Sequence, residues 1–180
     1  MKHALVVGGS GMLKKTSLWL ADNSYIVSVI GRNIQKLSKL SDMSKNIIPI
    51  SVDYYNESLF RSEVNNSIAR NGPYDLVIAW IHSNEKQIID IIYSEIRNIS
   101  NKEWRLFHVL GSNSNLEDTL REIDYIESCE YHQVQLGFII ENYKSRWLTH
   151  DEISNGVINC INTNSKKYLV GTLTPWNKRP

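Results

Sequence analysis

The sequence predicts an α/β fold in which a doubly wound parallel sheet of about seven strands carries helices on both faces. Short apolar runs rich in β-branched residues alternate with amphipathic segments of helical length, as expected for parallel strands joined by crossover helices. The alternation runs through nearly the whole chain, without an internal repeat or a linker-like change in composition. We therefore expect a single domain spanning residues 1–180.

The bounds of the expected elements follow from the length, periodicity and flanking residues of each segment. Strands are predicted at His3–Val7, Tyr25–Ile30, Ile47–Val52, Leu76–Trp80, Trp104–Leu110, His132–Ile140 and Tyr168–Thr172. Helices are predicted at Met12–Asp22, Asn33–Leu40, Asn56–Asn71, Glu85–Ile99, Leu116–Ser128 and Asp151–Asn162. The last helix should begin with a capping box formed by Thr149 and Glu152. Right-handed crossovers place the carboxyl ends of all strands at one edge, where ligands bind in such sheets.

Composition narrows the classes of partner. Lys and Arg total 20 against 19 for Asp and Glu, a formal net charge of +1, so we do not expect a nucleic acid partner. The chain has no signal peptide pattern and no apolar run of about 18 residues, which favours a cytoplasmic protein without a membrane partner. Cys129 and Cys160 are expected to be reduced core thiols. No histidine or acid cluster has metal-ligand spacing, so no metal is expected. The composition is compatible with a monomer or a homo-oligomer.

A glycine-rich turn follows the first predicted strand and precedes the first helix. It reads Gly8-Gly9-Ser10-Gly11-Met12-Leu13, and in this context backbone amides can approach the pyrophosphate of a dinucleotide. The sequence thus predicts a Rossmann-like fold, although a tight turn without a ligand is the alternative. Counting from the first glycines, Lys14 occupies the position of the third glycine of the motif. Either the helix stands away from the strand, or Lys14 points outward and reaches a phosphate.

The end of the second predicted strand indicates which dinucleotide binds. It reads Gly31-Arg32-Asn33 about 20 residues after the glycines, where a site for NAD(H) would carry an acidic residue. Arg32 is a planar cation suited to a 2′-phosphate, and Asn33 is a second donor. NADP(H) is therefore favoured over NAD(H) as cofactor. The alternative is an ordinary surface arginine at a strand end.

With these features the sequence resembles the short-chain dehydrogenase/reductase superfamily over most of its length. Val52-Asp53 resembles the family segment whose acid holds the adenine amino group, and Tyr54 follows it. Ala79-Trp80-Ile81-His82 resembles the Asn-Asn-Ala-Gly segment after the fourth strand. Gly111-Ser112 resembles the end of the strand that delivers the catalytic serine, and Gly137-Phe138-Ile139 the segment that packs on the nicotinamide. The resemblance implies cofactor contacts at these positions, in addition to the glycine turn and residues 31–33.

The family's Tyr-x-x-x-Lys pair is missing. Its lysine lowers the pKa of the tyrosine, which then exchanges a proton beside the hydride. Tyr125 and Tyr131 are followed four residues later by Cys129 and Gln135, and Tyr143 lies beyond the sixth predicted strand. The sequence is therefore identified as an atypical, shortened member.

Other polar residues are candidates to replace the pair. Ser112 is suited to orient a carbonyl and His82 to donate a proton, and Tyr131 is expected at the same edge just before the sixth strand. Each also has a structural alternative. His82 caps the helix that follows it, Ser112 forms a hydrogen bond within its turn or to the cofactor, and Tyr131 faces away from the site. His108, inside the fifth strand, is expected to be a core residue. The leading hypothesis is an NADP(H)-dependent oxidoreductase on a small carbonyl or imine compound. The alternative is a non-catalytic module that binds or senses NADP(H).

The segment Ser145–His150 leads into the last helix, where the resembling family closes over its substrate. Its aromatic and cationic residues suit an acidic or aromatic ligand. Alternatively, Trp147 packs against Trp176 while Arg146 is solvated. The closing stretch from Thr174 to Pro180 is expected to be a surface tail.

Overall fold

A computed structural model describes residues 1–82, 85–123 and 127–180. Its central sheet has seven parallel strands in the order β3-β2-β1-β4-β5-β6-β9. The strands are β1 (Lys2–Val7), β2 (Tyr25–Gly31), β3 (Ile47–Ser51), β4 (Leu76–Trp80), β5 (Trp104–Leu110), β6 (Cys129–Leu136) and β9 (Lys167–Val170). The strand order reverses next to β1, which places the glycine turn where a doubly wound sheet binds its ligand.

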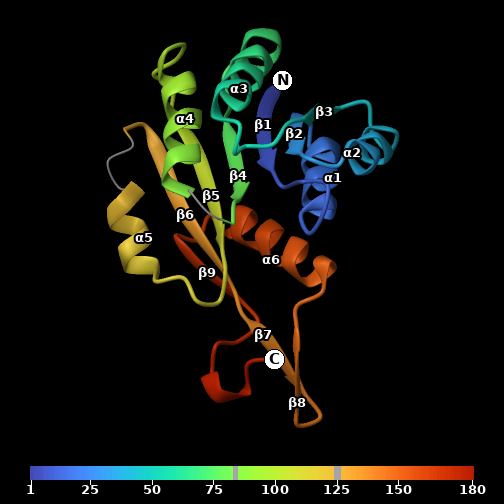
Figure 1. Cartoon of the computed structure of the whole chain (residues 1–180), viewed down its shortest axis with the longest axis vertical. Helices are drawn as coiled ribbons and strands as arrows, with labels where there is room; N and C mark the ends of the chain where they lie inside the picture. The colour runs from blue at the N-terminus through green and yellow to red at the C-terminus, as the bar shows by residue number, and fades with distance from the viewer. Residues whose placement is uncertain (83–84, 124–126) are drawn as a thin grey trace.

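Helices cover both faces of the sheet, as the sequence predicts (Figure 1). The helices α1 (Lys14–Asp22), α2 (Ile34–Ser41) and α6 (His150–Thr163) contribute buried side chains to one core. On the opposite face α3 (Glu57–Asn71), α4 (Glu85–Arg97) and α5 (Leu116–Ile123) contribute to a second core. The apolar strands are buried on both sides because each face has its own helical layer. The predicted fold class is therefore confirmed.

The sixth predicted strand, His132–Ile140, is wrong as a single element. The chain leaves the main sheet at Gly137, where only a glycine fits because a Cβ would lie 2.2 Å from the carbonyl oxygen of Thr172. A second, two-stranded sheet follows, formed by β7 (Phe138–Glu141) and β8 (Lys144–Trp147). In Figure 1 this hairpin extends beyond the carboxyl edge of the main sheet, beside the C-terminal segment with its short 3₁₀ helix η1 (Trp176–Lys178).

The helix bounds also differ from expectation at a few ends. Helix α1 begins at Lys14 rather than Met12, since a turn precedes it. Helix α5 ends at Ile123, and the predicted extension to Ser128 is wrong at its end because Ser128 has a φ of 58°; residues 124–126, with Tyr125, lie outside the described part of the chain. The predicted capping box of α6 is confirmed, with both reciprocal bonds between Thr149 and Glu152 present.

The two cysteines are free thiols with different surroundings. Cys160 is fully buried and Cys129 is half-buried. Burial raises the pKa of Cys160 to about 11 and that of Cys129 to about 12, so both thiols stay protonated near neutral pH. Along the described ranges, every helix is too short or too polar to cross a bilayer.

Helix α1 lies against the sheet without standing away from it. A Cβ on Gly9 would lie 2.7 Å from Ser17 Oγ and 2.8 Å from the Cγ1 atoms of Val6 and Val29. The Ser17 hydroxyl also donates a hydrogen bond to the Gly9 carbonyl at 3.1 Å. Gly9 thus gives the close helix-to-strand approach that we assigned to the third glycine, and Lys14 is exposed. Of the two options for Lys14, the outward orientation is confirmed.

Replacing Gly9 with alanine should therefore destabilise the protein. The added methyl group overpacks three neighbours at once, which we expect to cost about 1–3 kcal/mol of unfolding free energy. Gly11→Ala is the matched control, because a Cβ at Gly11 meets nothing within 4 Å. Urea unfolding of both variants measures the difference, and equal stability of the two would contradict the close packing at Gly9.

Candidate functional site

A cavity of about 350 Å³ opens at the carboxyl edge of the sheet beside the glycine turn. It is formed by the ends of β1, β2, β3 and β4, whose parallel register brings their last residues together. The residues that line it are Gly8, Ser10, Gly11, Met12, Ile30, Gly31, Arg32, Asn33, Lys36, Val52, Tyr54, Trp80 and His82. Ten of these thirteen were predicted as site residues, and the fold brings these ten together around one cavity.

The glycine turn is shaped to leave its backbone accessible. Gly8 has a φ of 80°, and its amide donates to the Ile30 carbonyl at 2.9 Å, which ties the turn to β2. Space above Gly11 is open, since a Cβ there would meet nothing within 4 Å. At Gly31 a Cβ would lie 3.0 Å from Ser10 Oγ, so a glycine lets the turn approach the end of β2. This is the geometry of a phosphate cradle at the start of a helix.

The far end of the cavity is cationic. Arg32 and Lys36 both line it, and among the described lining residues none is acidic. Arg32 Nη1 lies 3.8 Å from Asp53 Oδ2, but the two side chains are 66% and 42% exposed, so this pair holds Arg32 only weakly. Asn33 caps α2 by accepting a hydrogen bond from the Lys36 amide at 2.9 Å, which leaves its side-chain NH₂ as a donor.

Lys36 is a functional candidate that the sequence reasoning missed. The available signal was its position four residues after Arg32, within the first turn of α2. Residues at this spacing lie close together when a helix begins between them. Asp53, by contrast, was predicted to hold adenine but lies at the rim, where its Oδ1 accepts a hydrogen bond from the Tyr55 amide at 3.1 Å.

Aromatic side chains form the wall opposite the turn. Trp80 packs closely against Gly8, since a Cβ at Gly8 would lie 3.2 Å from the Trp80 carbonyl oxygen. The His82 ring meets the Trp80 indole edge-on, with centroids 4.9 Å apart. The His82 amide donates to the Tyr54 hydroxyl at 3.4 Å, and burial raises the pKa of Tyr54. The ends of β3 and β4 are thereby joined across the cavity.

A second, apolar hollow of about 250 Å³ adjoins the first. The two share Met12 and Trp80, and the second is completed by Gly111, Ser112, Leu136, Gly137, Trp147, Leu148 and Ile153. We refer to it as the apolar hollow. Of the three predicted catalytic residues, only Ser112 lines it, whereas His82 lines the first cavity. The structure therefore does not bring His82 and Ser112 into one hollow.

A side chain of β6 holds the turn that carries Ser112. Gln135 Nε2 donates to the Ser114 carbonyl at 2.9 Å, and the Ser114 amide donates to the Gly111 carbonyl at 3.1 Å. Gln135 is almost fully buried, so it fixes the turn relative to the sheet. The Ser112 hydroxyl is within 3.3 Å of Asn113 Oδ1 and remains half-exposed toward the apolar hollow.

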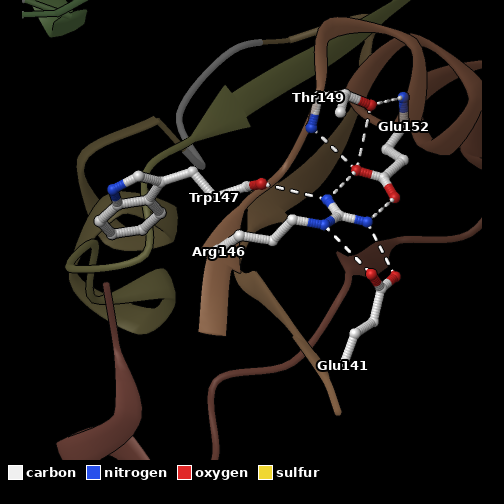
Figure 2. A network of polar contacts seen from close by, with 5 residues as sticks. All are labelled: Glu141, Arg146, Trp147, Thr149 and Glu152. Carbon is white, nitrogen blue, oxygen red and sulfur yellow. Dashed lines mark hydrogen bonds and ion pairs between the residues drawn. The ribbon is translucent and has the colours of Figure 1, made fainter. Parts of the chain in front are cut away.

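A network centred on Arg146 attaches the β7–β8 hairpin to the start of α6 (Figure 2). Arg146 Nη2 donates to Glu141 at 2.8 Å, and its two terminal nitrogens donate to Glu152 at 2.9 and 3.0 Å. Glu152 in turn accepts from the Thr149 amide at 2.8 Å. Figure 2 shows the Trp147 ring on the opposite side of the strand from the Arg146 guanidinium. The network thus positions Trp147 at the apolar hollow, and the alternative of a merely solvated Arg146 is wrong.

Several residues predicted to contact a cofactor have buried side chains instead. Leu13, Ala79 and Phe138 are 0% exposed, and Ile81 is 2% exposed. These side chains belong to the core, and only the backbone groups of these residues lie close to the carboxyl edge of the sheet. Ile139 lies within the hairpin strand β7 and Gly9 packs under α1. The side chains of Leu13, Ala79, Ile81 and Phe138 therefore pack into the core, which leaves only the backbone groups of these residues for a ligand.

The expectation that Tyr131 lies at the carboxyl edge is also wrong. Tyr131 is the third residue of β6 and pairs in register with Leu106, closer to the amino edge of the sheet. Its hydroxyl lies 3.0 Å from His108 Nδ1, and burial raises its pKa well above the usual range. His108 is fully buried as predicted, and burial lowers its pKa to about 3. Residues at the start of a parallel strand cannot reach the edge where the strand ends.

Glu152→Gln should lower thermal stability near neutral pH, with an effect that fades in acid. Hydrogen bonds from Arg146 and Thr149 lower the pKa of Glu152 from 4.5 to about 2 in the folded protein. A group whose pKa is lowered by folding stabilises the folded state above its unfolded pKa, and that contribution is lost as the pH falls towards the folded pKa. The melting temperatures of variant and wild type should differ most above pH 4.5 and converge towards about pH 2.

Thermal unfolding followed by circular dichroism across this pH range measures the effect. Glu103→Gln is the control, since it removes an exposed carboxylate outside the Arg146 network. A constant difference between Glu152→Gln and wild type at every pH would show that the network does not depend on the carboxylate charge.

Comparisons with known proteins bear on the fold. No protein-family model and no curated protein sequence matches the chain. A short-chain dehydrogenase/reductase family oxidoreductase of Aeromonas hydrophila is similar in structure, with a TM-score of 0.71 and 13% identity over 96% of this chain and 99% of that one. A short-chain dehydrogenase/reductase of Burkholderia phymatum in complex with NAD has a TM-score of 0.72 and 10% identity, covering 94% and 88% of the two chains.

A metagenomic short-chain oxidoreductase in complex with NADP is likewise similar, with a TM-score of 0.65 and 12% identity over 96% of this chain and 98% of that one. Likeness at such low identity concerns the arrangement of strands and helices. The resemblance read from the sequence is confirmed at this level. The chain has the fold of the short-chain dehydrogenase/reductase superfamily.

Proposed function

We propose that the protein is an NADP(H)-dependent oxidoreductase acting on a small carbonyl or imine compound. The observation that carries this proposal is the pair of adjoining cavities at the carboxyl edge, one lined by the glycine turn and the other apolar. They share Met12 and Trp80 as a common wall. An extended dinucleotide fits such a pair, with its phosphates at the turn and its reactive ring beside a substrate hollow.

The residues of the first cavity suit NADP(H) in particular. The amides of the glycine turn would bind the pyrophosphate, while Arg32 and Lys36 would bind the 2′-phosphate. Tyr54 would pack against the adenine, as aromatic rings do with bases. The similar structures in complex with NAD and with NADP show that this fold accepts either dinucleotide. The proposed preference for NADP(H) over NAD(H) therefore rests on Arg32 and Lys36 and on the absence of an acidic residue among the described lining residues.

The apolar hollow suits reduction of a carbonyl group. NADPH held at the turn would supply the hydride for reduction of the carbonyl to an alcohol, whose oxygen would receive its proton from solvent. Ser112, by rotating its hydroxyl away from Asn113 Oδ1, would donate a hydrogen bond to that oxygen as its negative charge develops. The side chains of Trp80, Leu136 and Trp147 would limit the access of water. His82 lines the neighbouring cavity, so we assign it to cofactor binding rather than proton transfer.

A second candidate function is a non-catalytic module that binds or senses NADP(H). The observation that favours it is the lack of a replacement for the Tyr-x-x-x-Lys pair among the described residues at the hollow. Tyr131 is turned towards His108, and the described lining of the hollow includes neither tyrosine nor lysine. Such a module would bind NADP(H) as tightly but exchange no hydride.

Oxidation of NADPH in the presence of a panel of carbonyl and imine compounds separates the two functions. We expect absorbance at the reduced nicotinamide to fall with at least one compound. Tight NADPH binding by calorimetry without oxidation across a broad panel would instead support the module. Failure to bind either dinucleotide would contradict both.

Arg32→Ala should weaken NADPH binding by about 1.5–3 kcal/mol, because it removes a charged hydrogen bond to the 2′-phosphate. NADH has no such phosphate, so its affinity should change little. Isothermal titration calorimetry with each dinucleotide measures the selectivity. Arg70→Ala is the matched control, since Arg70 is exposed in the last turn of α3. An equal loss for both dinucleotides would show that Arg32 does not read the 2′-phosphate.

Ser112→Ala should reduce kcat by about a hundredfold or more while leaving the Kd for NADPH nearly unchanged, because the lost hydrogen bond forms mainly as the oxygen becomes negative. Steady-state kinetics with an accepted substrate measures this effect. The control is Ser114→Ala, which removes a hydroxyl from the same turn outside the described lining of the hollow. Equal rates for the two variants would remove Ser112 from the reaction.

A further inference from the structure

The C-terminal segment brings an arginine against Trp147, which lines the apolar hollow. The Arg179 guanidinium contacts two indole rings, with its central carbon 5.4 Å from the Trp147 ring centroid and 4.8 Å from that of Trp176. Its Nη1 also donates to Asn113 Oδ1. The predicted surface tail is thus anchored, and the predicted direct packing of Trp147 on Trp176 is replaced by contacts through Arg179.

Two of these contacts connect Arg179 to residues of the hollow. Trp147, whose ring it contacts, lines the hollow from the β7–β8 hairpin. Asn113, to which it donates, is the partner of Ser112, which lines the hollow from the turn after β5. Arg179 therefore contacts one residue that lines the hollow, Trp147, and the hydrogen-bond partner of another, Ser112.

The charge of Arg179 is not neutralised within the protein. Along the described ranges, no carboxylate forms an ion pair with it, whereas Arg146 in the nearby hairpin pairs with Glu141 and Glu152. Arg179 is half-buried, so its charge is partly shielded from water. A partly buried cation without a counter-ion is a favourable binding point for an anion.

The contacts of Arg179 leave its donors available. The two indoles make cation–π contacts with the guanidinium, and Asn113 engages one donor among the five that the group carries. A carboxylate binds the free donors of such a group with two parallel hydrogen bonds. The contacts with the two indoles and Asn113 already restrict the side chain, so little side-chain entropy is lost on binding.

The hollow itself selects an apolar body of limited size. Its lining includes six apolar or aromatic side chains, from Met12, Trp80, Leu136, Trp147, Leu148 and Ile153. Its volume of about 250 Å³ lies below the range of about 300–1,000 Å³ typical of drug-sized ligands. A single ring or a short branched chain fits these dimensions.

We propose that the substrate is a small carbonyl compound with an apolar, preferably aromatic, body and a carboxylate that Arg179 binds at the rim of the hollow. This inference rests on the proposed function, because it takes the hollow as the substrate site. Ser112 would then hold the carbonyl oxygen while Arg179 holds the carboxylate. Two fixed points and a shaped apolar wall would determine the orientation of the substrate.

Binding of an unreactive analogue tests this assignment independently of turnover. Phenylacetate and phenylacetamide have the same apolar body and differ in charge. Titrated by calorimetry into protein saturated with NADP⁺, phenylacetate should bind at least about tenfold more tightly, as a charged hydrogen bond predicts. Arg179→Gln should abolish this preference, and Arg179→Lys should keep part of it, since lysine retains the charge without the planar fork.

Lys178→Gln is the matched control, because it removes the neighbouring exposed cation and should leave the preference unchanged. Thermal unfolding of each variant shows whether the fold is retained. Equal affinity of wild type for both compounds, with NADP⁺ bound, would overturn the inference and leave the proposed function standing. A preference that survives in Arg179→Gln would also overturn it. A wild-type protein that binds neither NADP⁺ nor NADPH would overturn the proposed function itself.

Discussion

The contact between helix α1 and the sheet at Gly9 is the constraint on which the rest of the site depends. With no Cβ between them, Ser17 and the valines of β1 and β2 close around the turn, and the amides that follow are presented at the carboxyl edge. The Ser154 hydroxyl of α6 donates to the Met12 carbonyl of the turn at 2.7 Å, and the Thr16 hydroxyl of α1 donates to the Ser154 carbonyl at 3.3 Å. The cavity at the glycine turn and the apolar hollow share Met12.

The β7–β8 hairpin extends this arrangement beyond the sheet. Gly137 passes too close to Thr172 for any side chain, and the next residue, Phe138, exchanges two backbone hydrogen bonds with Thr172, both at 2.9 Å. The hairpin is held at its base by this bridge and by the buried Phe138 side chain, and towards α6 by the charged hydrogen bonds of Arg146. It contributes Trp147 to the wall of the hollow, whereas Met12, from the turn before α1, and Trp80, from β4, pack against the core.

The sequence was sufficient to predict the seven-stranded sheet, because parallel strands buried on both faces are short apolar runs and their crossover helices are amphipathic. It was also sufficient to place Gly8 to Gly11 and Arg32 beside one another, since both follow strands that end at one edge. It failed for Leu13, Ile81 and Phe138, whose backbone lies near the edge while the side chain is buried. Proximity along the chain does not determine the face to which a side chain points.

What the sequence by itself determined is therefore the fold, the glycine turn and the position of Arg32 beside it, all of which follow from local periodicity and short spacings. Only the tertiary structure decided the apolar hollow. Its residues come from the turn before α1, from β4, from the turn after β5, from the end of β6 and from the hairpin with the start of α6. Arg179 contacts Asn113 from 66 positions further along the chain. No local pattern encodes such a meeting, because it results from how separate elements pack and not from the preference of any one of them.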